Sequence, residues 1–331
     1  MPIPLVMLLG AALLDFLIGD PWGWPHPVQA MGWAIARYQT WVCDRWAQPD
    51  RRRRAGLLLT LILVVGSGSF GWAIVQGGNA CLPHLGDSLG TILLASCFAG
   101  RSLRDAAEDV LKPLCRGDLP QARQNLSRYV GRDTDTLDEP GILRALIETV
   151  TENATDGVLA PLFWAMVGAS LPGVGPLPFA LAYKAASTLD SMIGYRIEPY
   201  RDIGRCGARL EDRLTWLPCR LVVLSIALIS GHPRRVLELC RRDAPADPSP
   251  NAGWSECAYA AALGIQLGGE NHYRGQVRYK PLLGDPTRSL DQALVYQALE
   301  LTRICYLIWL AIYSVITLYL FNSQTIHSIF Q

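Results

Sequence analysis

Three stretches of this chain, at 55–76, 158–182 and 304–321, run for 22, 25 and 18 residues without a charged side chain. A helix that spans the hydrocarbon core of a bilayer needs about 20 largely apolar residues. The helices of a soluble core rarely stay uncharged over such lengths, because one of their faces usually meets water. The pattern therefore favours an integral membrane protein over a soluble protein with a large core.

Weaker apolar runs complete the set, each shorter or interrupted by one charge. The expected membrane segments are 3–19, 55–76, 85–100, 158–182, 214–231 and 304–321. Charged residues make up 18% of the chain, against about 25% in ordinary soluble domains. The net charge of +1 excludes a nucleic-acid binder that works by bulk electrostatics. We expect an all-α, polytopic membrane protein that folds as a single domain over 1–331.

The placement of basic residues predicts the topology. Six, eight, six and nine of them lie in the four loops 20–54, 101–157, 183–213 and 232–303. The positive-inside rule assigns such loops to the cytoplasm, so we expect long helical cytoplasmic loops. The prolines and glycines at 172–178 break the stretch 158–182. A broken or re-entrant hairpin there would return the chain to the same face.

The strongest chemical signal lies on a helix that Asp138 and Pro140 are expected to open. Apolar residues share one arc of this helix: Ile142, Leu143, Leu146, Ile147 and Val150. Glu148, Glu152 and Asp156 follow at four-residue spacing on the other side. Three carboxylates in one row repel one another unless a cation faces them. The row is either a solvated acidic face or a site for Mg²⁺, which takes carboxylate and phosphate oxygens.

A second polar cluster at 183–196 follows the broken apolar stretch. It contains Lys184, Asp190 and Arg196 together with several hydroxyl groups. Its two cations can hold phosphate oxygens, or they can anchor the chain at the membrane interface. Weaker candidates are His26, Asn251 and Trp254, none of which is diagnostic alone. The sequence contains no GxxxxGK[ST] loop, no GxGxxG after a strand and no HExxH or GxSxG motif.

Taken together, these stretches resemble the adenosylcobinamide-phosphate synthase family of cobalamin biosynthesis (the CobD/CbiB family). The matching residues are Gly19-Asp20-Pro21, His26-Pro27-Val28, Val130 to Thr134, Glu148, Glu152-Asn153, Asp156-Gly157, Ala160 to Phe163, Tyr183-Lys184-Ala185, Thr188 to Met192, Gly194-Tyr195-Arg196, Pro250 to Trp254 and Leu267-Gly268-Gly269. They occur in the family's order and cover about 12–285. Ser187 departs from the pattern, since the family has Asn there, although a hydroxyl can replace part of an amide's hydrogen bonding.

The resemblance implies an enzyme that joins adenosylcobyric acid to aminopropanol, or to its O-phosphate, through an amide bond, with ATP and Mg²⁺. The expected catalytic residues are Glu148, Glu152, Asp156, Lys184 and Asp190. Of these, Glu148, Glu152 and Asp156 are the expected Mg²⁺ ligands. The expected substrate-binding residues are Asp20, His26, Asn153, Arg196, Asn251 and Trp254. The resemblance also implies a multi-pass protein of the bacterial inner membrane that works beside other membrane enzymes of the pathway, and it leaves the oligomeric state open.

A membrane phosphotransferase could also use an acid-rich helix, but its usual signature has more acids at four-residue spacing than the three found here. Two other classes of protein remain as alternatives. A transporter can carry intramembrane charges and a broken helix, but the two halves of this chain do not match. A non-catalytic scaffold for corrinoid intermediates is the other. Synthesis of the amide by the purified chain would exclude both.

Overall fold

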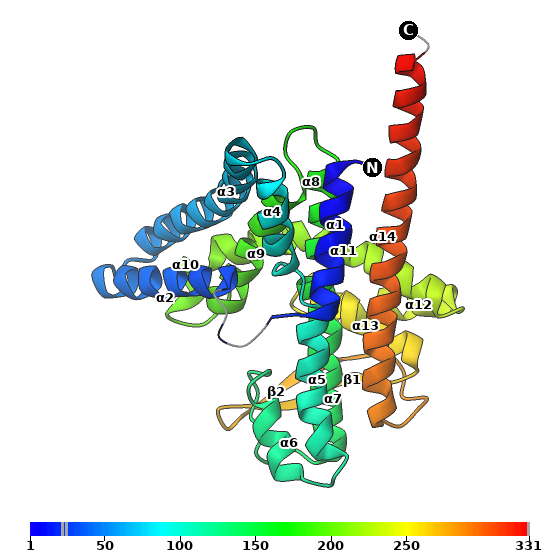
Figure 1. Cartoon of the computed structure of the whole chain (residues 1–331). Coiled ribbons are helices and arrows are strands. Elements are labelled where there is room, and N and C mark those ends of the chain that lie inside the picture. The colour runs from blue at the N-terminus through cyan, green and yellow to red at the C-terminus, as the bar shows by residue number, and fades with distance from the viewer. Residues whose placement is uncertain (21–22, 24–25, 330–331) are drawn as a thin grey trace. The chain divides into compact units, whose positions relative to one another are not determined.

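The structure of the protein, a computed structural model, describes residues 1–20, 23 and 26–329, and for 324–329 the backbone alone. Helices account for 74% of the residues that the structure describes. The chain divides into two compact units (Figure 1). Unit 1 comprises Met1–Ala99, Ala160–Leu214 and Ile308–Gln331, and unit 2 comprises Gly100–Leu159 and Thr215–Leu307.

Unit 1 is built from helices alone in the part of the chain that the structure describes. These are α1 (Ile3–Leu17), α2 (Pro27–Arg45), α3 (Pro49–Cys81), α4 (Leu85–Ala95), α8 (Ala160–Ala169), α9 (Pro176–Ile193) and α10 (Tyr200–Ile203). Helix α9 lies at the centre and packs against α2, α3, α4 and α8. Two long helices, α11 (Arg205–Ile229) and α14 (Gln292–Ile329), contribute residues to both units.

Unit 2 combines helices with one small sheet. Its elements are α5 (Gly100–Leu114), α6 (Leu119–Leu126), α7 (Glu139–Asn153), the π-helix η1 (Ala154–Leu159), α12 (Pro233–Asp243), the 3₁₀-helix η2 (Ala244–Ala246), α13 (Ala252–Leu263), β1 (Leu267–Tyr273) and β2 (Gln276–Leu283). Asp138 caps α7 by accepting a hydrogen bond from the Gly141 amide at 2.9 Å, as the sequence predicted. The apolar arc of α7 is buried as well.

The sheet corrects the all-α expectation. The Leu267-Gly268-Gly269 stretch opens strand β1, which pairs antiparallel with β2 (Figure 1). Arg274 and Gly275 form the connecting turn, and both have positive φ, 51° and 75°. Two such residues favour a tight hairpin because their twist matches that of the strands. Arg274-Gly275 is not one of the usual Asn-Gly or Asp-Gly signals, which explains why the sequence did not predict a hairpin here.

Two helices in the described residues are long and apolar enough to cross a bilayer: α3, and Gln292–Ser323 of α14. Both contain an 18-residue window with mean hydropathy 2.1, of which only 22% and 17% is buried within the protein. A core helix of a soluble protein would bury most of such a surface. The two exposed apolar helices therefore suggest a membrane protein.

The other expected segments take different forms. Helices α1 and α4 contain 15 and 11 residues, and at about 1.5 Å per residue both are shorter than the roughly 30 Å hydrocarbon core. The stretch 158–182 is interrupted, as its prolines predicted. Helix α8 ends at Ala169 and α9 begins at Pro176, and the turn between them contains Gly173 and Gly175 with φ of 74° and 83°.

The crossing of α3 and α4 depends on Gly86. A Cβ atom at this position would lie 1.9 Å from the Val75 carbonyl oxygen, so the two backbones touch where Gly86 has no side chain. By contrast, Gly77 on α3 has no atom within 4 Å of the equivalent position. The two glycines therefore differ in packing although both are helical.

We predict that Gly86→Ala lowers the stability of the protein by about 1–3 kcal/mol, the usual cost of overpacking. Gly77→Ala should be neutral or stabilising by up to about 1 kcal/mol, because alanine favours a helix over glycine. Thermal unfolding of both variants in detergent measures the difference. Equal melting temperatures for the two variants would contradict the close approach at Gly86.

Candidate functional site

The best-defined polar site of unit 2 is centred on Glu148, whose side chain is only 1% exposed. One guanidinium nitrogen of Arg132 donates to Glu148 Oε2, and a second donates to Asn271 Oδ1 at 2.8 Å. The backbone amide of Gly268 donates to Glu148 Oε1 at 2.8 Å. Both oxygens of Glu148 are therefore engaged. A carboxylate is tolerated at this depth only because a cation and a backbone amide compensate its charge.

Glycines allow the hairpin to approach α7. Gly268 and Gly269 have φ of 86° and 88°, and a Cβ on Gly269 would lie 3.0 Å from Nη1 of Arg144 on α7. Arg144 of α7 donates to the carbonyl oxygens of Gly268 and Glu270 at 2.8 and 2.7 Å. The Gly-Gly pair therefore brings β1 close enough for its backbone to bond both Glu148 and Arg144.

The loop that carries Arg132 also holds the hairpin turn. Asp133 accepts hydrogen bonds from the amides of Arg274 and Gly275 at 2.9 and 2.7 Å, and its own amide donates to the His272 carbonyl at 2.8 Å. The amides of Gly275 and Arg274 lower the pKa of Asp133, because they stabilise its charged form. Arg132 and Asp133, two residues of one matched motif, thus fix both ends of β1.

A second buried ion pair joins α13 to β2. Lys280 Nζ lies 2.6 and 2.8 Å from the two carboxylate oxygens of Glu256, whose side chain is fully buried. Burial opposes the charge of Lys280, but the carboxylates of Glu256, Glu148 and Glu152 outweigh this effect and raise its pKa. Burial also raises the pKa of Glu256 well above its usual value, and Lys280 acts in the opposite direction.

Glu152, one turn along α7 from Glu148, is the remaining acid of this region. We call Arg132, Glu148, Glu152, Glu256 and Lys280 the α7 charge cluster. Glu152 is exposed to solvent, and within the described residues it makes no hydrogen bond or ion pair. Desolvation by the surrounding protein raises its pKa, and Lys280 acts in the opposite direction. Three carboxylates face two cations in the cluster, and Glu152 is the one without a direct partner.

Hydrogen bonds fasten the end of α7 and η1 to α13. Ser255 Oγ donates to the Thr151 carbonyl at 2.7 Å and lies 2.7 Å from Thr155 Oγ1. Asp156, in the π-helix, is half-buried. Single π-turns inside α-helices are frequent at functional sites. The row of acids predicted from the sequence therefore divides into a buried Glu148, an exposed Glu152 and a half-buried Asp156.

The amide and indole candidates of unit 2 also lie on α7 and at the start of α13. Asn153 is exposed, and its Nδ2 donates to the Thr149 carbonyl at 2.9 Å. Asn251 is buried and accepts a hydrogen bond from Arg220 at 2.9 Å. The Arg220 guanidinium lies 4.7 Å from the centre of the Trp254 ring. Trp254 is thus part of a cation–π contact within the protein.

The other predicted residues belong to unit 1. Lys184, Ser187 and Asp190 are half-buried on α9, and the spacing places Lys184 and Ser187 on one face. A Cβ on Gly194 would lie 2.1 Å from Asp190 Oδ1, so Gly194 makes room for this carboxylate. Arg196 is exposed and acts on Asp212, whose pKa is raised mainly by burial.

Asp20 and His26 lie side by side in unit 1. His26 Nε2 is 3.1 Å from Asp20 Oδ1, and His26 Nδ1 accepts a hydrogen bond from the Val28 amide at 3.2 Å. With Nδ1 as acceptor, Nε2 carries the proton and donates to Asp20. His26 therefore caps α2. Pro21, part of the same matched motif, lies outside the described residues.

The donor set can be tested against Mg²⁺. In the described part of the chain, no three His, Cys, Asp or Glu residues form a group that could hold a metal ion. Glu148 has both oxygens engaged, which does not fit a preformed site with three carboxylates. The exposed carboxylate of Glu152 does fit an ion that arrives with phosphate groups, because Mg²⁺ commonly binds one or two carboxylates plus substrate phosphates.

Two residues of the cluster were not singled out from the sequence. Glu256 is the only charged residue in α13, AGWSECAYAAAL. An isolated acid in an apolar helix is a signal that could have been used, because such acids are rarely buried without a partner. Lys280 stands in an exposed polar strand, where a lysine is unremarkable. Only the folded structure shows that it pairs with Glu256.

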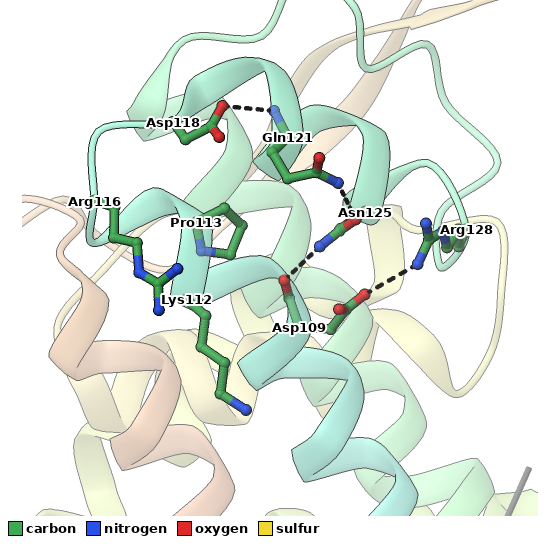
Figure 2. Close-up of a pocket in the computed structure, with 8 residues that line it drawn as sticks. All are labelled: Asp109, Lys112, Pro113, Arg116, Asp118, Gln121, Asn125 and Arg128. Atoms are coloured by element: carbon green, nitrogen blue, oxygen red, sulfur yellow. Dashed lines mark hydrogen bonds and ion pairs between the residues drawn. The ribbon is translucent and has the colours of Figure 1, made fainter.

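A separate cavity of unit 2, about 410 Å³ in volume, lies between α5, α6 and the turn joining them (Figure 2). It is lined by Asp109, Lys112, Pro113, Arg116, Asp118, Gln121, Asn125 and Arg128. None of the predicted site residues lines it. Arg128 pairs with Asp109 at 3.6 Å, and Lys112 pairs with Glu108 at 3.4 Å. Because two of its cations are already paired and its walls carry no matched motif, we place the candidate site at the α7 charge cluster.

The two acids of α7 that belong to the charge cluster should respond oppositely to neutralisation. Glu148→Gln removes the charge that Arg132 compensates, and we expect a loss of about 3 kcal/mol in unfolding free energy. Glu152→Gln should raise stability at pH 8, because the folded state disfavours the charge on Glu152. A raised pKa means that the folded state binds the proton more tightly than the unfolded state.

The stability of the wild type should therefore fall, relative to Glu152→Gln, as pH rises above about 4.3, the ordinary pKa of glutamate. Below that pH the two proteins should be equally stable. Thermal unfolding in detergent at several pH values measures this difference. A Glu152→Gln variant less stable than wild type at pH 8 would show that the charge is compensated in the fold.

Comparison with known proteins agrees with the matched motifs. A sequence model described as CobD/Cbib protein matches residues 8–302. The chain is 51% identical over 305 residues to "Cobalamin biosynthesis protein CobD" of Synechocystis sp., covering 92% of this chain and 89% of that protein. It is 42% identical over 286 residues to "Cobalamin biosynthesis protein CbiB" of Salmonella arizonae, covering 85% and 87%. No solved structure matches. The chain belongs to the CobD/CbiB family.

Proposed function

We propose that this protein acts in cobalamin biosynthesis as an ATP-dependent ligase. It would join the carboxyl group of adenosylcobyric acid to aminopropanol, or to its O-phosphate, through an amide bond. Family membership supports the pathway, since the related proteins are named for cobalamin biosynthesis. The observation that supports the chemistry is Glu152, an exposed carboxylate without a direct partner beside two compensated ion pairs.

The reaction needs an activated carboxyl group. A carboxylate is a poor acyl donor, so its oxygen first attacks the terminal phosphate of ATP, which gives an acyl phosphate and ADP. The amine then attacks the acyl carbon, phosphate leaves, and the amine nitrogen loses a proton. Positioning of the reactants and neutralisation of the phosphate charge provide most of the catalysis in such a scheme.

We assign the roles by exposure and charge. Glu152 and Asp156 would hold the Mg²⁺ that accompanies the phosphates, and this ion would neutralise their charge. Glu148 would support Arg132 and β1. Asn153, exposed at the end of α7, would orient an amide of the corrinoid. Asn251 and Trp254 would hold the start of α13 near η1.

Unit 1 carries matched polar residues of its own. Lys184 and Arg196 would bind phosphate oxygens. Asp190 or the Asp20–His26 pair would accept the proton released by the amine.

The proposal is tested by synthesis with the purified protein in detergent or nanodiscs. With adenosylcobyric acid, aminopropanol or its O-phosphate, ATP and Mg²⁺, the wild type should form the amide and ADP in equal amounts, measured by mass spectrometry. Glu152→Gln should reduce product by at least about 100-fold, the scale of losing one key electrostatic contact. Glu270→Gln, an exposed change on β1, is the matched control and should keep full activity. Transport of a corrinoid into sealed vesicles without product formation would favour the transporter instead.

We also propose a multi-pass protein of the bacterial inner membrane. The short loop after α3 would lie outside, and the basic loops would face the cytoplasm. Cys81 and Cys115 are both exposed and report on these two sides. In single-cysteine variants, a membrane-impermeant maleimide should label Cys81 in intact spheroplasts and Cys115 only after lysis. Labelling of both before lysis would refute this topology.

A further inference from the structure

The charges of the α7 charge cluster do not balance. Arg132 compensates Glu148, and Lys280 compensates Glu256 through both carboxylate oxygens. Glu152 remains as one net negative charge. Lys280 acts electrostatically on Glu152 as well as on Glu256, so a single ammonium group stands between a buried acid and an exposed one. If Lys280 pairs with Glu256, Glu152 attracts an incoming cation more strongly than if Lys280 pairs with Glu152.

The geometry shows that Lys280 pairs with Glu256. Lys280 Nζ lies within hydrogen-bond distance of both oxygens of Glu256, and no such contact joins it to Glu152 in the described structure. Lys280 keeps 23% of its side chain exposed, whereas the Glu256 side chain is fully buried. A fully buried carboxylate cannot obtain compensation from water, so it retains the ammonium group.

We propose that Glu256 and Lys280 are positioning residues for Glu152. Their pair fixes β2 to α13, and because the two charges cancel, Glu152 keeps the net negative charge that draws a divalent cation to the site. This inference rests on the proposed role of Glu152 in holding Mg²⁺. Glu256 is fully buried and cannot touch a ligand itself. Its proposed function is to bind Lys280, so that Lys280 does not pair with Glu152.

The other charged groups near Glu152 come from separate elements. Asp247, in the loop before α13, and Glu148 repel its charge, and Arg132 attracts it. Asp247 has one oxygen, Oδ2, that is buried without a hydrogen-bond partner. Its carboxylate therefore adds to the negative charge around Glu152 and does not offset it. Arg132 is bound to Glu148 and Asn271. Lys280 is therefore the cation whose release would change the site most.

The test measures Mn²⁺ binding in the presence of inorganic phosphate, by electron paramagnetic resonance of the free ion, to the full-length protein in nanodiscs. In Glu256→Gln, Lys280 loses its partner and should pair with Glu152. We expect Mn²⁺ affinity to fall about tenfold, as one added charge nearby can produce. The double variant Lys280→Met/Glu256→Gln removes both charges and should recover the wild-type affinity to within about twofold. Replacing a buried ion pair by uncharged groups is often tolerated by the fold.

Two further variants keep the inference falsifiable if Glu256→Gln does not fold. Lys280→Met alone should bind Mn²⁺ at least as tightly as wild type, because it removes a positive charge and leaves Glu256 either ionised or protonated. Glu270→Gln should match wild type. A purely structural role predicts weaker binding in Lys280→Met and in the double variant, and either result would overturn the inference.

Amide formation and Mn²⁺ affinity, measured on the same protein samples, distinguish this inference from the proposed function. A wild-type protein that forms the amide but binds no Mn²⁺ would overturn the inference while the ligase proposal stands. The predicted pattern of Mn²⁺ affinities without any amide product would support the inference and refute the ligase. Unchanged affinity in a folded Glu256→Gln variant would overturn the inference directly.

Discussion

The buried ion pair between Arg132 and Glu148 is the contact on which unit 2 depends. Glu148 is almost fully buried, and its charge is tolerated because Arg132 and the Gly268 amide bind its two oxygens. Through this one carboxylate, the loop before α7, the helix itself and strand β1 are fixed to one another. Gly269 allows the close approach of β1 to α7, since a Cβ there would lie 3.0 Å from Arg144 Nη1. Gly268 makes room for the Pro281 carbonyl of β2.

The same principle distinguishes the acids of the α7 charge cluster from one another. Within the α7 charge cluster, the two most buried carboxylates each have a cation, and the exposed Glu152 has none. A fold can retain an uncompensated acid only where water or a ligand can reach it. The uncompensated negative charge of the cluster therefore lies on Glu152, a side chain of a helix whose other face packs into the core. The related proteins of the CobD/CbiB family are named for cobalamin biosynthesis.

Part of this organisation was predictable from the sequence. The Asp138 cap, the apolar arc of α7, the two long apolar helices and the break between α8 and α9 follow from short-range patterns of capping residues, periodicity and proline. The hairpin did not, because Arg274-Gly275 is not a usual turn signal. Nor did the pairings of Arg132 with Glu148 and Lys280 with Glu256, since spacing shows which acids share a helix face but not which cations the folded chain brings to them. The predicted row of three acids therefore contained one that serves the fold.

The contact between Glu148 and Gly268 joins residues that are 120 positions apart. Between them the chain passes through 160–214, which belongs to the other unit. During synthesis, α7 and Arg132 thus emerge long before the strand that completes their pairing. Until β1 is made, one oxygen of Glu148 lacks its backbone donor, and α7 lacks its contacts with α13. Unit 2 can therefore complete its folding only late in synthesis. A ribosome that stalls before residue 268 would leave α7 incompletely packed and accessible to chaperones and proteases.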